Sequence, residues 1–408
     1  MTALHDLHAS ELLVHFRDRS LSPVEVTRAV LDRIAAWEPH LHATYALDGE
    51  AALASARVSE ARWLRHESGE KVGALEGVPT MIKENIATVG TPMPLGTAAT
   101  ELVAAVRDAP PAARLREAGA VILGKTTMPD YGMLSSGLSS FHGLTRNPWD
   151  LTRNPGGSSS GASAACAAGY GPLHLGTDIG GSVRLPAGWC GIFTLKPSLG
   201  RIPINPPYAG RVAGPMTRTV VDAALMMGVL AQADDRDAMS LPAQTIEWQR
   251  LERDLAGLRI GLLGDIGVGL PVDPEVADAV EAAAKRFEAA GARVDRVAPF
   301  LTRTMLEGMD DFWRMRAWLD ISALREERRA RALPFIVECA ARRSRASGSF
   351  AATARWQRCA TLPSPRAGRT TSSSRRRRRS PPTTPSGRAP PTIPSGRSST
   401  SPSPCRST

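Results

Sequence analysis

Two short runs rich in glycine and serine, at residues 155–161 and 176–184, hold the densest group of residues that could take part in chemistry. Paired glycines directly before a serine allow backbone conformations that other residues avoid, and they leave amide groups open to an approaching oxygen. A serine there can act as a nucleophile beside amides that stabilise an oxyanion. Composition alone is equally compatible with two flexible turns. A phosphate-binding loop is the weakest reading, because neither run ends in Gly-Lys-Ser or Gly-Lys-Thr.

A nucleophilic serine needs a base, and the histidines offer no clear one. Six of the eight lie within the first 66 residues, and His142 and His174 stand alone without a local partner pattern, so structural roles are favoured for both. Lys83 is the alternative, because it ends an apolar stretch at 78–82 that would carry its amine into the interior. Burial disfavours the ammonium form, so such a lysine can serve as a base near neutral pH. A buried ion pair of Lys83 with Glu84 or Asp178 is the competing interpretation.

Strands and helices alternate around these residues. A capping box at 22–25, with proline at the first helical position, predicts a helix from there to about Trp37. Further helices are expected at 51–65, 110–118, 158–168, 222–232 and 274–290, and strands at 78–82, 121–123, 173–175, 258–263 and 292–297. This alternation predicts an α/β fold with a mainly parallel sheet covered on both faces. Residues 304–345 look helical and charged, with no evident packing partner.

Composition narrows the class of protein. Of the 408 residues, 42% are hydrophobic, which is enough for a large core, and no run of eighteen apolar residues predicts a membrane span. The N-terminal residues do not resemble a secretory signal, and the five cysteines are an odd number, so we expect reduced thiols in a cytoplasmic protein. The net charge of +10 comes entirely from residues 361–408, and residues 1–360 balance to zero.

Several blocks in a fixed order make the chain similar to a known family. They lie at residues 77–86, 118–126, 147–150, 190–191, 195–198 and 214–218, interleaved with the two glycine-serine runs. With them, residues 5–355 resemble the amidase signature family of serine hydrolases. The resemblance implies a single large α/β/α domain with a central mixed, mainly parallel sheet, and the composition of the last residues predicts a disordered C-terminal tail after it.

The resemblance also implies a catalytic Ser–Ser–Lys triad. Ser182 would be the nucleophile, Ser158 the bridging serine and Lys83 the base, with a cis peptide bond before Ser158. The backbone amides of Ile179, Gly180, Gly181 and Ser182 would form the oxyanion hole. The backbone near Gly132 would face the acyl group of the substrate.

The resemblance also assigns supporting roles to two residues, and three other positions differ from the family pattern. Asp178 and Arg184 would support the oxyanion loop without reacting. Three positions depart from the pattern, namely Glu84, Thr127 and Ser160, and the hydroxyl of Ser160 is expected near the proton relay. These departures bear on substrate preference more than on activity.

The expected function is hydrolysis of a small-molecule carboxylic amide to an acid and ammonia or an amine, through an acyl-enzyme and without cofactor or metal. One alternative within the family is the A-type subunit of an amidotransferase, which acts with partner subunits. It ranks lower because residues 205–214 are shorter than, and unlike, that subunit's usual sequence. We expect no membrane and no specific nucleic acid as partner, and a homodimer is one option.

The last fifty residues form a segment of a different kind. The resemblance predicts an amidase signature domain over 1–358, without the C-terminal part of the family fold. The composition of 359–408, rich in Arg, Ser and Pro, predicts a disordered tail. A shifted reading frame is the favoured origin of this tail, and a basic segment that binds nucleic acid nonspecifically is the alternative. On either reading, an inactive remnant stays an alternative to an active enzyme.

Overall fold

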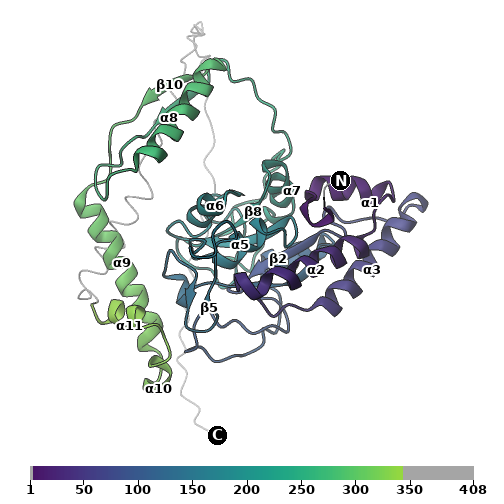
Figure 1. Ribbon diagram of the computed structural model, residues 1–408, viewed down its shortest axis with the longest axis horizontal. Helices are drawn as coiled ribbons and strands as arrows, with labels where there is room; N and C mark the ends of the chain where they lie inside the picture. The colour runs from purple at the N-terminus through teal and green to yellow at the C-terminus, as the bar shows by residue number, and fades with distance from the viewer. Residues whose placement is uncertain (1–2, 343–408) are drawn as a thin grey trace, which may run out of the picture. The chain divides into compact units, whose positions relative to one another are not determined.

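The structure, a computed structural model, describes residues 3–342, and Figure 1 shows its secondary structure. A central sheet of six strands has the order β1-β3-β2-β6-β8-β7. The strands are β1 (Thr44–Tyr45), β2 (Pro79–Lys83), β3 (Val121–Thr126), β6 (Leu173–Asp178), β7 (Phe193–Thr194) and β8 (Val212–Thr217). Strands β3, β2 and β6 are parallel, whereas β1 and β8 run antiparallel to their neighbours. Four of the six strands therefore point the same way, which confirms the mixed, mainly parallel sheet.

Helices cover this sheet on both faces. Every residue of β2, β6 and β8 is buried, which is the pattern of strands enclosed from both sides. Helix α3 packs against β3, helix α7 against β8, and helix α5 against β2, β3, β6 and β8. The helices of this part are α1 (Ala9–Arg17), α2 (Pro23–Leu41), α3 (Gly49–Arg65), α4 (Pro110–Glu117), α5 (Ser160–Ala167), α6 (Arg184–Cys190) and α7 (Val220–Leu230). Short 3-10 turns lie at Leu4–Asp6, His66–Ser68 and Asp130–Gly132.

The start of α2 follows the sequence signal. The hydroxyl of Ser22 accepts a hydrogen bond from the amide of Glu25, and the Glu25 carboxylate accepts one from the amide of Ser22. These two bonds satisfy amides that the first turn of a helix leaves without partners. The predicted capping box is confirmed, and the helix runs on to Leu41.

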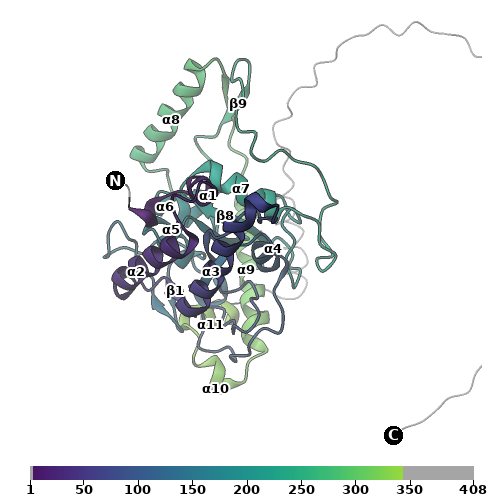
Figure 2. The same cartoon turned by 90° about the vertical axis from the view of Figure 1, so that its right-hand side faces the viewer.

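A second, smaller sheet forms no backbone pairing with the central sheet within residues 3–342. Strands β9 (Arg259–Leu262) and β10 (Arg293–Arg296) pair in parallel, and α8 (Pro274–Ala289) connects them and packs on β10 (Figures 1 and 2). The predicted strands are thus present, but among the described residues neither joins the central sheet. The hairpin of β4 (Leu138–Ser139) and β5 (Gly143–Leu144) is the third sheet.

The helical pattern predicted over 304–345 corresponds to three helices among the described residues, α9 (Arg303–Ser322), α10 (Glu326–Arg329) and α11 (Pro334–Ala341). Helices α9 and α11 pack against each other, at the green to yellow end of the ribbon in Figure 1. Their buried residues, including Ala317 and Ile336, form one apolar cluster with Ala99 and Tyr131. The packing partner that the sequence did not reveal is therefore the loop around Tyr131.

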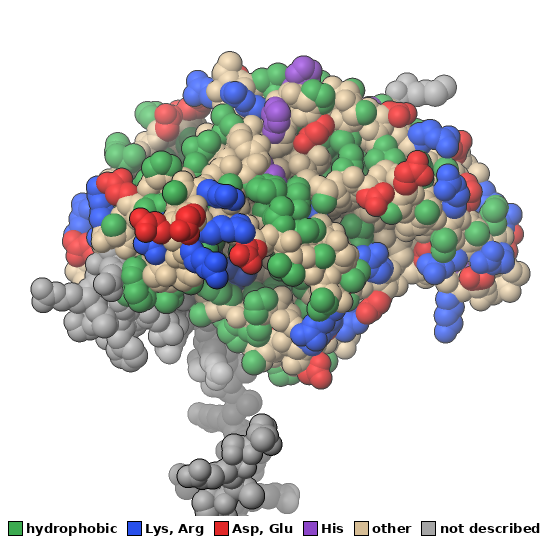
Figure 3. Space-filling view, turned by 90° about the horizontal axis from the view of Figure 1, so that it is seen from below, with side chains coloured by type: hydrophobic (Ala, Val, Ile, Leu, Met, Phe, Trp, Pro, Cys, Tyr) green, Lys and Arg blue, Asp and Glu red, His purple; other side chains and the backbone are tan. Residues whose placement is uncertain are grey.

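The surface agrees with the balanced charge of residues 1–360. On the face shown in Figure 3, basic and acidic side chains are interspersed. Between residues 3 and 342, no helix combines the length and apolar character that crossing a bilayer requires. Cys166, Cys190 and Cys339 are free thiols. The predicted end of the domain at residue 358 and the predicted tail lie outside the described residues.

Candidate active site

Lys83 is the last residue of β2, in the middle of the sheet, and its side chain is fully buried. Its Nζ donates hydrogen bonds to the Oγ of Ser158 at 2.9 Å and to the Oγ of Ser159 at 3.0 Å. Burial holds the pKa of Lys83 well below its ordinary value, and the positive charge of Arg211 lowers it further. The site therefore favours an uncharged amine that is bonded to two hydroxyls.

The competing interpretation of Lys83 as half of an ion pair does not hold. The carboxylate of Glu84 pairs with His142, at 2.8 Å between Oε2 and Nε2. The carboxylate of Asp178 pairs with Arg184, at 2.9 Å. Because both carboxylates have other partners, Lys83 forms its hydrogen bonds with the serine hydroxyls instead of an ion pair.

Ser158 follows a cis peptide bond from Gly157, as the resemblance implies, and its side chain is buried. Gly132 lies directly beside it. A Cβ added to Gly132 would stand 3.1 Å from the Oγ of Ser158, and the backbone there has a φ of +66°. Only glycine combines that conformation with this close approach, so the loop at Gly132 forms one wall of the space around Ser158.

Ser159 is a member of the site that sequence reasoning missed. Besides accepting from Lys83, its hydroxyl donates to the carbonyl of Thr177 at 3.2 Å. Its amide donates to the carbonyl of Ser182 at 3.0 Å, which ties the two glycine-serine runs together. The available signal was the run of three consecutive serines at 158–160, of which the first two contact the lysine.

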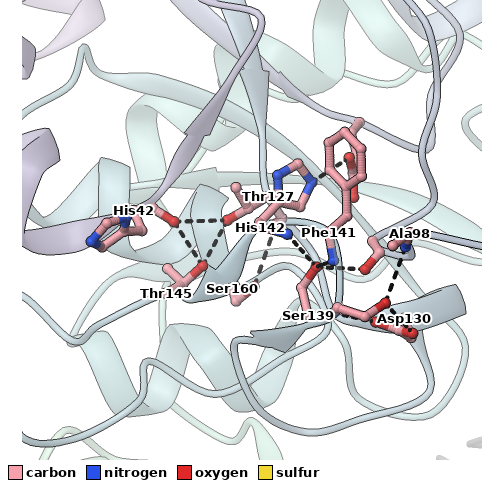
Figure 4. Close-up of polar contacts among 12 residues, drawn as sticks. His42, Ala98, Thr127, Asp130, Ser139, Phe141, His142, Thr145 and Ser160 are labelled. Atoms are coloured by element: carbon pink, nitrogen blue, oxygen red, sulfur yellow. Dashed lines mark hydrogen bonds and ion pairs between the residues drawn. The ribbon is translucent and has the colours of Figure 1, made fainter. Parts of the chain in front are cut away.

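Ser160 corrects one prediction. Its hydroxyl donates to the backbone carbonyl of Thr127 at 3.4 Å and does not face the relay. Thr127 also shares a hydrogen bond of 2.8 Å with Thr145, and Thr145 donates to the carbonyl of His42, as Figure 4 shows. The hydroxyl of Ser160 therefore belongs to a structural network at the start of α5.

A second network in Figure 4 fixes the loop that carries Gly132. The carboxylate of Asp130 accepts from the amide and hydroxyl of Ser140, at 2.7 and 2.8 Å. It also accepts from the amide of Leu333 at 2.9 Å, which links the loop to the start of α11. These contacts hold the loop of Gly132 between the turn that joins β4 to β5 and the start of α11.

Asp178 organises the loop that carries Ser182. Its carboxylate accepts from the amides of Gly181 and Val183 and takes two hydrogen bonds from the Arg184 guanidinium. Burial alone would raise the pKa of Asp178, but these four bonds outweigh it and keep the pKa below its ordinary value. The amide of Gly181 already donates to Asp178. Of the predicted oxyanion hole, the amides of Ile179, Gly180 and Ser182 are therefore the better candidates to bind a substrate oxygen.

Ser182 and Ser158 line one narrow pocket, together with Gly132 and Ile179. No hydrogen bond joins the two hydroxyls within the part of the chain that the structure describes. In structures without substrate, catalytic hydrogen bonds are commonly long and tighten only in the substrate complex. The pocket is completed by residues from distant segments, namely Asn85, Tyr131, Arg211, Trp313 and Arg316.

His142 and His174, for which the sequence favours structural roles, contact neighbouring residues and not the two serines. His174 is buried in β6, its ring contacts the carbonyl of Gly171, and burial lowers its pKa to about 3. His142 bonds Glu84 and stacks edge-on against Tyr45. Across residues 3–342, no three His, Cys, Asp or Glu side chains gather as ligands for a metal ion.

Comparison with known proteins places this geometry in a family. A family model described as Amidase matches residues 25–344. Among curated proteins, the chain is 42% identical over 296 residues to the A-type subunit of the glutamyl-tRNA(Gln) amidotransferase of Acidothermus cellulolyticus, covering 71% of this chain and 58% of that protein. It is 39% identical over 302 residues to an acylamidase of Rhodococcus erythropolis, covering 72% and 62%. The chain thus spans about three fifths of the length of these relatives.

Solved structures give the same picture. A bacterial aryl acylamidase of the amidase signature enzymes matches with a TM-score of 0.78 and 31% identity, over 87% of this chain and 76% of that one. The peptide amidase of Stenotrophomonas maltophilia matches with a TM-score of 0.75 and 27% identity, over 87% and 80%. Because the family model covers most of the sequence, the chain belongs to the amidase signature family.

Proposed function

We propose that this chain is an amidase, which hydrolyses a carboxylic amide to an acid and ammonia or an amine through an acyl-enzyme. The observation that carries the proposal is the 2.9 Å hydrogen bond from the buried Nζ of Lys83 to the Oγ of Ser158, in the pocket that Ser182 also lines. An uncharged amine next to two hydroxyls is the arrangement that activates a serine without histidine.

In the proposed acylation step, Lys83 accepts a proton from Ser158 while Ser158 accepts one from Ser182. The Oγ of Ser182 then bonds to the amide carbonyl carbon, and negative charge develops on the carbonyl oxygen. The backbone amides of Ile179, Gly180 and Ser182 stabilise that charge, as preorganised donors do in acyl transfer, while the amide of Gly181 stays bonded to Asp178. The proton returns through Ser158 to the leaving nitrogen, and the C–N bond breaks.

Water completes the cycle. It attacks the ester on Ser182 and gives a proton to the same relay, and the relay protonates the Oγ of Ser182 as the acid leaves. The low pKa of Lys83 supports this role, because the amine must be free of its proton at the start of each half-reaction.

An A-type amidotransferase subunit is a second candidate, because several relatives at 36–42% identity bear that name. Both candidates would use the same serines and lysine on an amide. Co-purification with partner subunits, or ammonia release that depends on them, would favour the second candidate. A chain that releases ammonia alone would favour the first. The homodimer also stays a prediction, which analytical ultracentrifugation would test.

The experiment for the proposed function measures ammonia or amine release from a panel of aliphatic and aryl amides by the full chain. The exposed Ser198 supplies a matched control, since Ser198→Ala removes a hydroxyl outside the pocket. We expect release by the parent chain and by Ser198→Ala, and none by Ser182→Ala. Equal release by Ser182→Ala and the parent would overturn the proposal.

A further inference from the structure

Two arginines line the pocket that also holds the two serines. Arg211 immediately precedes β8, and Arg316 comes from the middle of α9, yet both line the space that contains Ser158 and Ser182. Arg316 is 7% exposed, and its Nη2 donates to the carbonyl of Tyr131. Its buried Nε has no hydrogen-bond partner. A buried donor without an acceptor is costly and marks a place where an acceptor is expected.

Within the described residues, neither arginine forms an ion pair with a carboxylate. The other acids near the pocket are already engaged, Glu84 by His142 and Asp178 by Arg184. Asp320 is close enough to be influenced by both arginines, but it lies beyond ion-pair distance, and burial raises its pKa. Two neighbouring cations therefore share a buried pocket without an anion of the protein in contact.

Aromatic rings hold both guanidinium groups in place. The Cζ of Arg211 lies 4.3 Å from the ring centre of Tyr208, and the Cζ of Arg316 lies 5.5 Å from the same ring. Trp313 approaches Arg316 from its own helix at 5.2 Å. Such contacts orient a guanidinium but do not neutralise it. Burial and the charge of Arg316 lower the pKa of Arg211 to about 10, so Arg211 still carries its charge at neutral pH.

We propose that Arg211 and Arg316 form a subsite for a carboxylate on the substrate, so that the preferred substrate is a short amide that carries a carboxylate near the scissile carbonyl. This inference rests on the proposed amidase function and names its substrate class. Guanidinium groups match a carboxylate with paired hydrogen bonds, and the bonds are strong where water is excluded. The cavity here is narrow, with a volume of about 10 Å³ against the ~300–1,000 Å³ of sites for drug-sized ligands, which favours a small acyl group over a bulky one.

The kinetic test compares two substrates of nearly equal size, succinamate and the neutral succinamide. Because hydrogen bonds to charged groups contribute more than neutral ones, we expect the full chain to show a kcat/KM about 10- to 100-fold higher for succinamate. Arg316→Gln and Arg211→Gln should reduce that preference mainly through KM. Arg314→Gln is the matched control, because Arg314 lies on the same helix, pairs with Asp310 and does not line the pocket.

A binding measurement separates this inference from the proposed function. Titration of succinate into Ser182→Ala, followed by calorimetry, needs no turnover. We expect saturable binding that weakens about 10-fold or more when Arg316→Gln or Arg211→Gln is added, and that is unchanged with Arg314→Gln. Hydrolysis of both amides at equal efficiency, with no succinate binding, would overturn the subsite and leave the amidase standing. Succinate binding without hydrolysis of any amide would support the subsite and count against the amidase.

Discussion

Glu84 directs its carboxylate to His142, 2.8 Å away, while the adjacent Lys83 donates to two serine hydroxyls. The two residues are neighbours in sequence, but alternate side chains at the end of a strand point to opposite faces. This division of partners keeps an acid out of contact with the amine. It is the structural reason why the low pKa of Lys83 survives beside a buried carboxylate.

Lys83 sets the first prediction. Its pKa lies below the usual value for lysine, so kcat/KM should rise with pH as the amine loses its proton and should level off below the range of an exposed lysine. Lys83→Met should lower kcat about 10³-fold or more, within the range of a lost general base. Lys83→Arg should not restore activity, since a guanidinium keeps its proton. Activity of Lys83→Arg near the parent value, with the same pH profile, would contradict the role of a neutral base.

Ser159 sets the second prediction. Ser159→Ala removes one of the two hydroxyls that hold Lys83, and the loss of one hydrogen bond should lower kcat about 10-fold. Ser160→Ala is the control, because the neighbouring hydroxyl makes only a 3.4 Å contact with the carbonyl of Thr127. Steady-state kinetics of the two variants, with circular dichroism to check folding, compares them. Equal effects would show that Ser159 has no special role in holding the amine.

Gly132 sets the third prediction. Gly132→Ala places a Cβ 3.1 Å from the Oγ of Ser158, and small displacements of a reacting group can cost about 10²-fold in rate. Gly143→Ala is a matched control, because its φ of +78° is similar but its added Cβ would meet nothing within 4 Å. Both variants should lose about 1–2 kcal/mol of unfolding free energy from the left-handed backbone. Only Gly132→Ala should lose activity strongly, and a similar loss in both would refute the steric argument.

Asp178 sets the fourth prediction. Its folded pKa lies below the unfolded value, so the carboxylate contributes stability that is present above about pH 4 and is lost as pH falls through the folded pKa. Asp178→Asn should therefore lower the unfolding free energy by about 2 kcal/mol at pH 7, and the difference should shrink in acid. Urea unfolding at several pH values measures this difference.

The exposed Asp278 of α8 gives the control for that measurement, since Asp278→Asn should change stability little at any pH. A pH-independent difference for Asp178→Asn would show that the carboxylate charge does not matter.

Part of this site was predictable from the sequence, for identifiable reasons. The burial of Lys83 follows from the apolar strand that it ends, and the parallel pairing of β2 and β6 brings the end of that strand beside the second glycine-serine run. Assigning Ser158 and Ser182 to roles came from the family resemblance, because composition alone left flexible turns equally plausible.

The rest depends on tertiary contacts that no local pattern encodes. Trp313 and Arg316 reach the pocket from α9 only because that helix packs on the loop around Tyr131. The sequence of α9 shows a helix, but the partner of its apolar face lies about 180 residues earlier in the chain. Similarly, the direction of the Ser160 hydroxyl is decided by the position of the Thr127 carbonyl, which belongs to the end of another strand.

The central claim is that the Oγ of Ser182 becomes covalently bonded during the reaction. Labelling the full chain with a fluorophosphonate probe, followed by peptide mass mapping, tests it most directly. We predict a single adduct on Ser182, no adduct in Ser182→Ala, and slow labelling in Lys83→Met. An adduct on a different serine, or labelling of Ser182→Ala at the parent rate, would contradict the account.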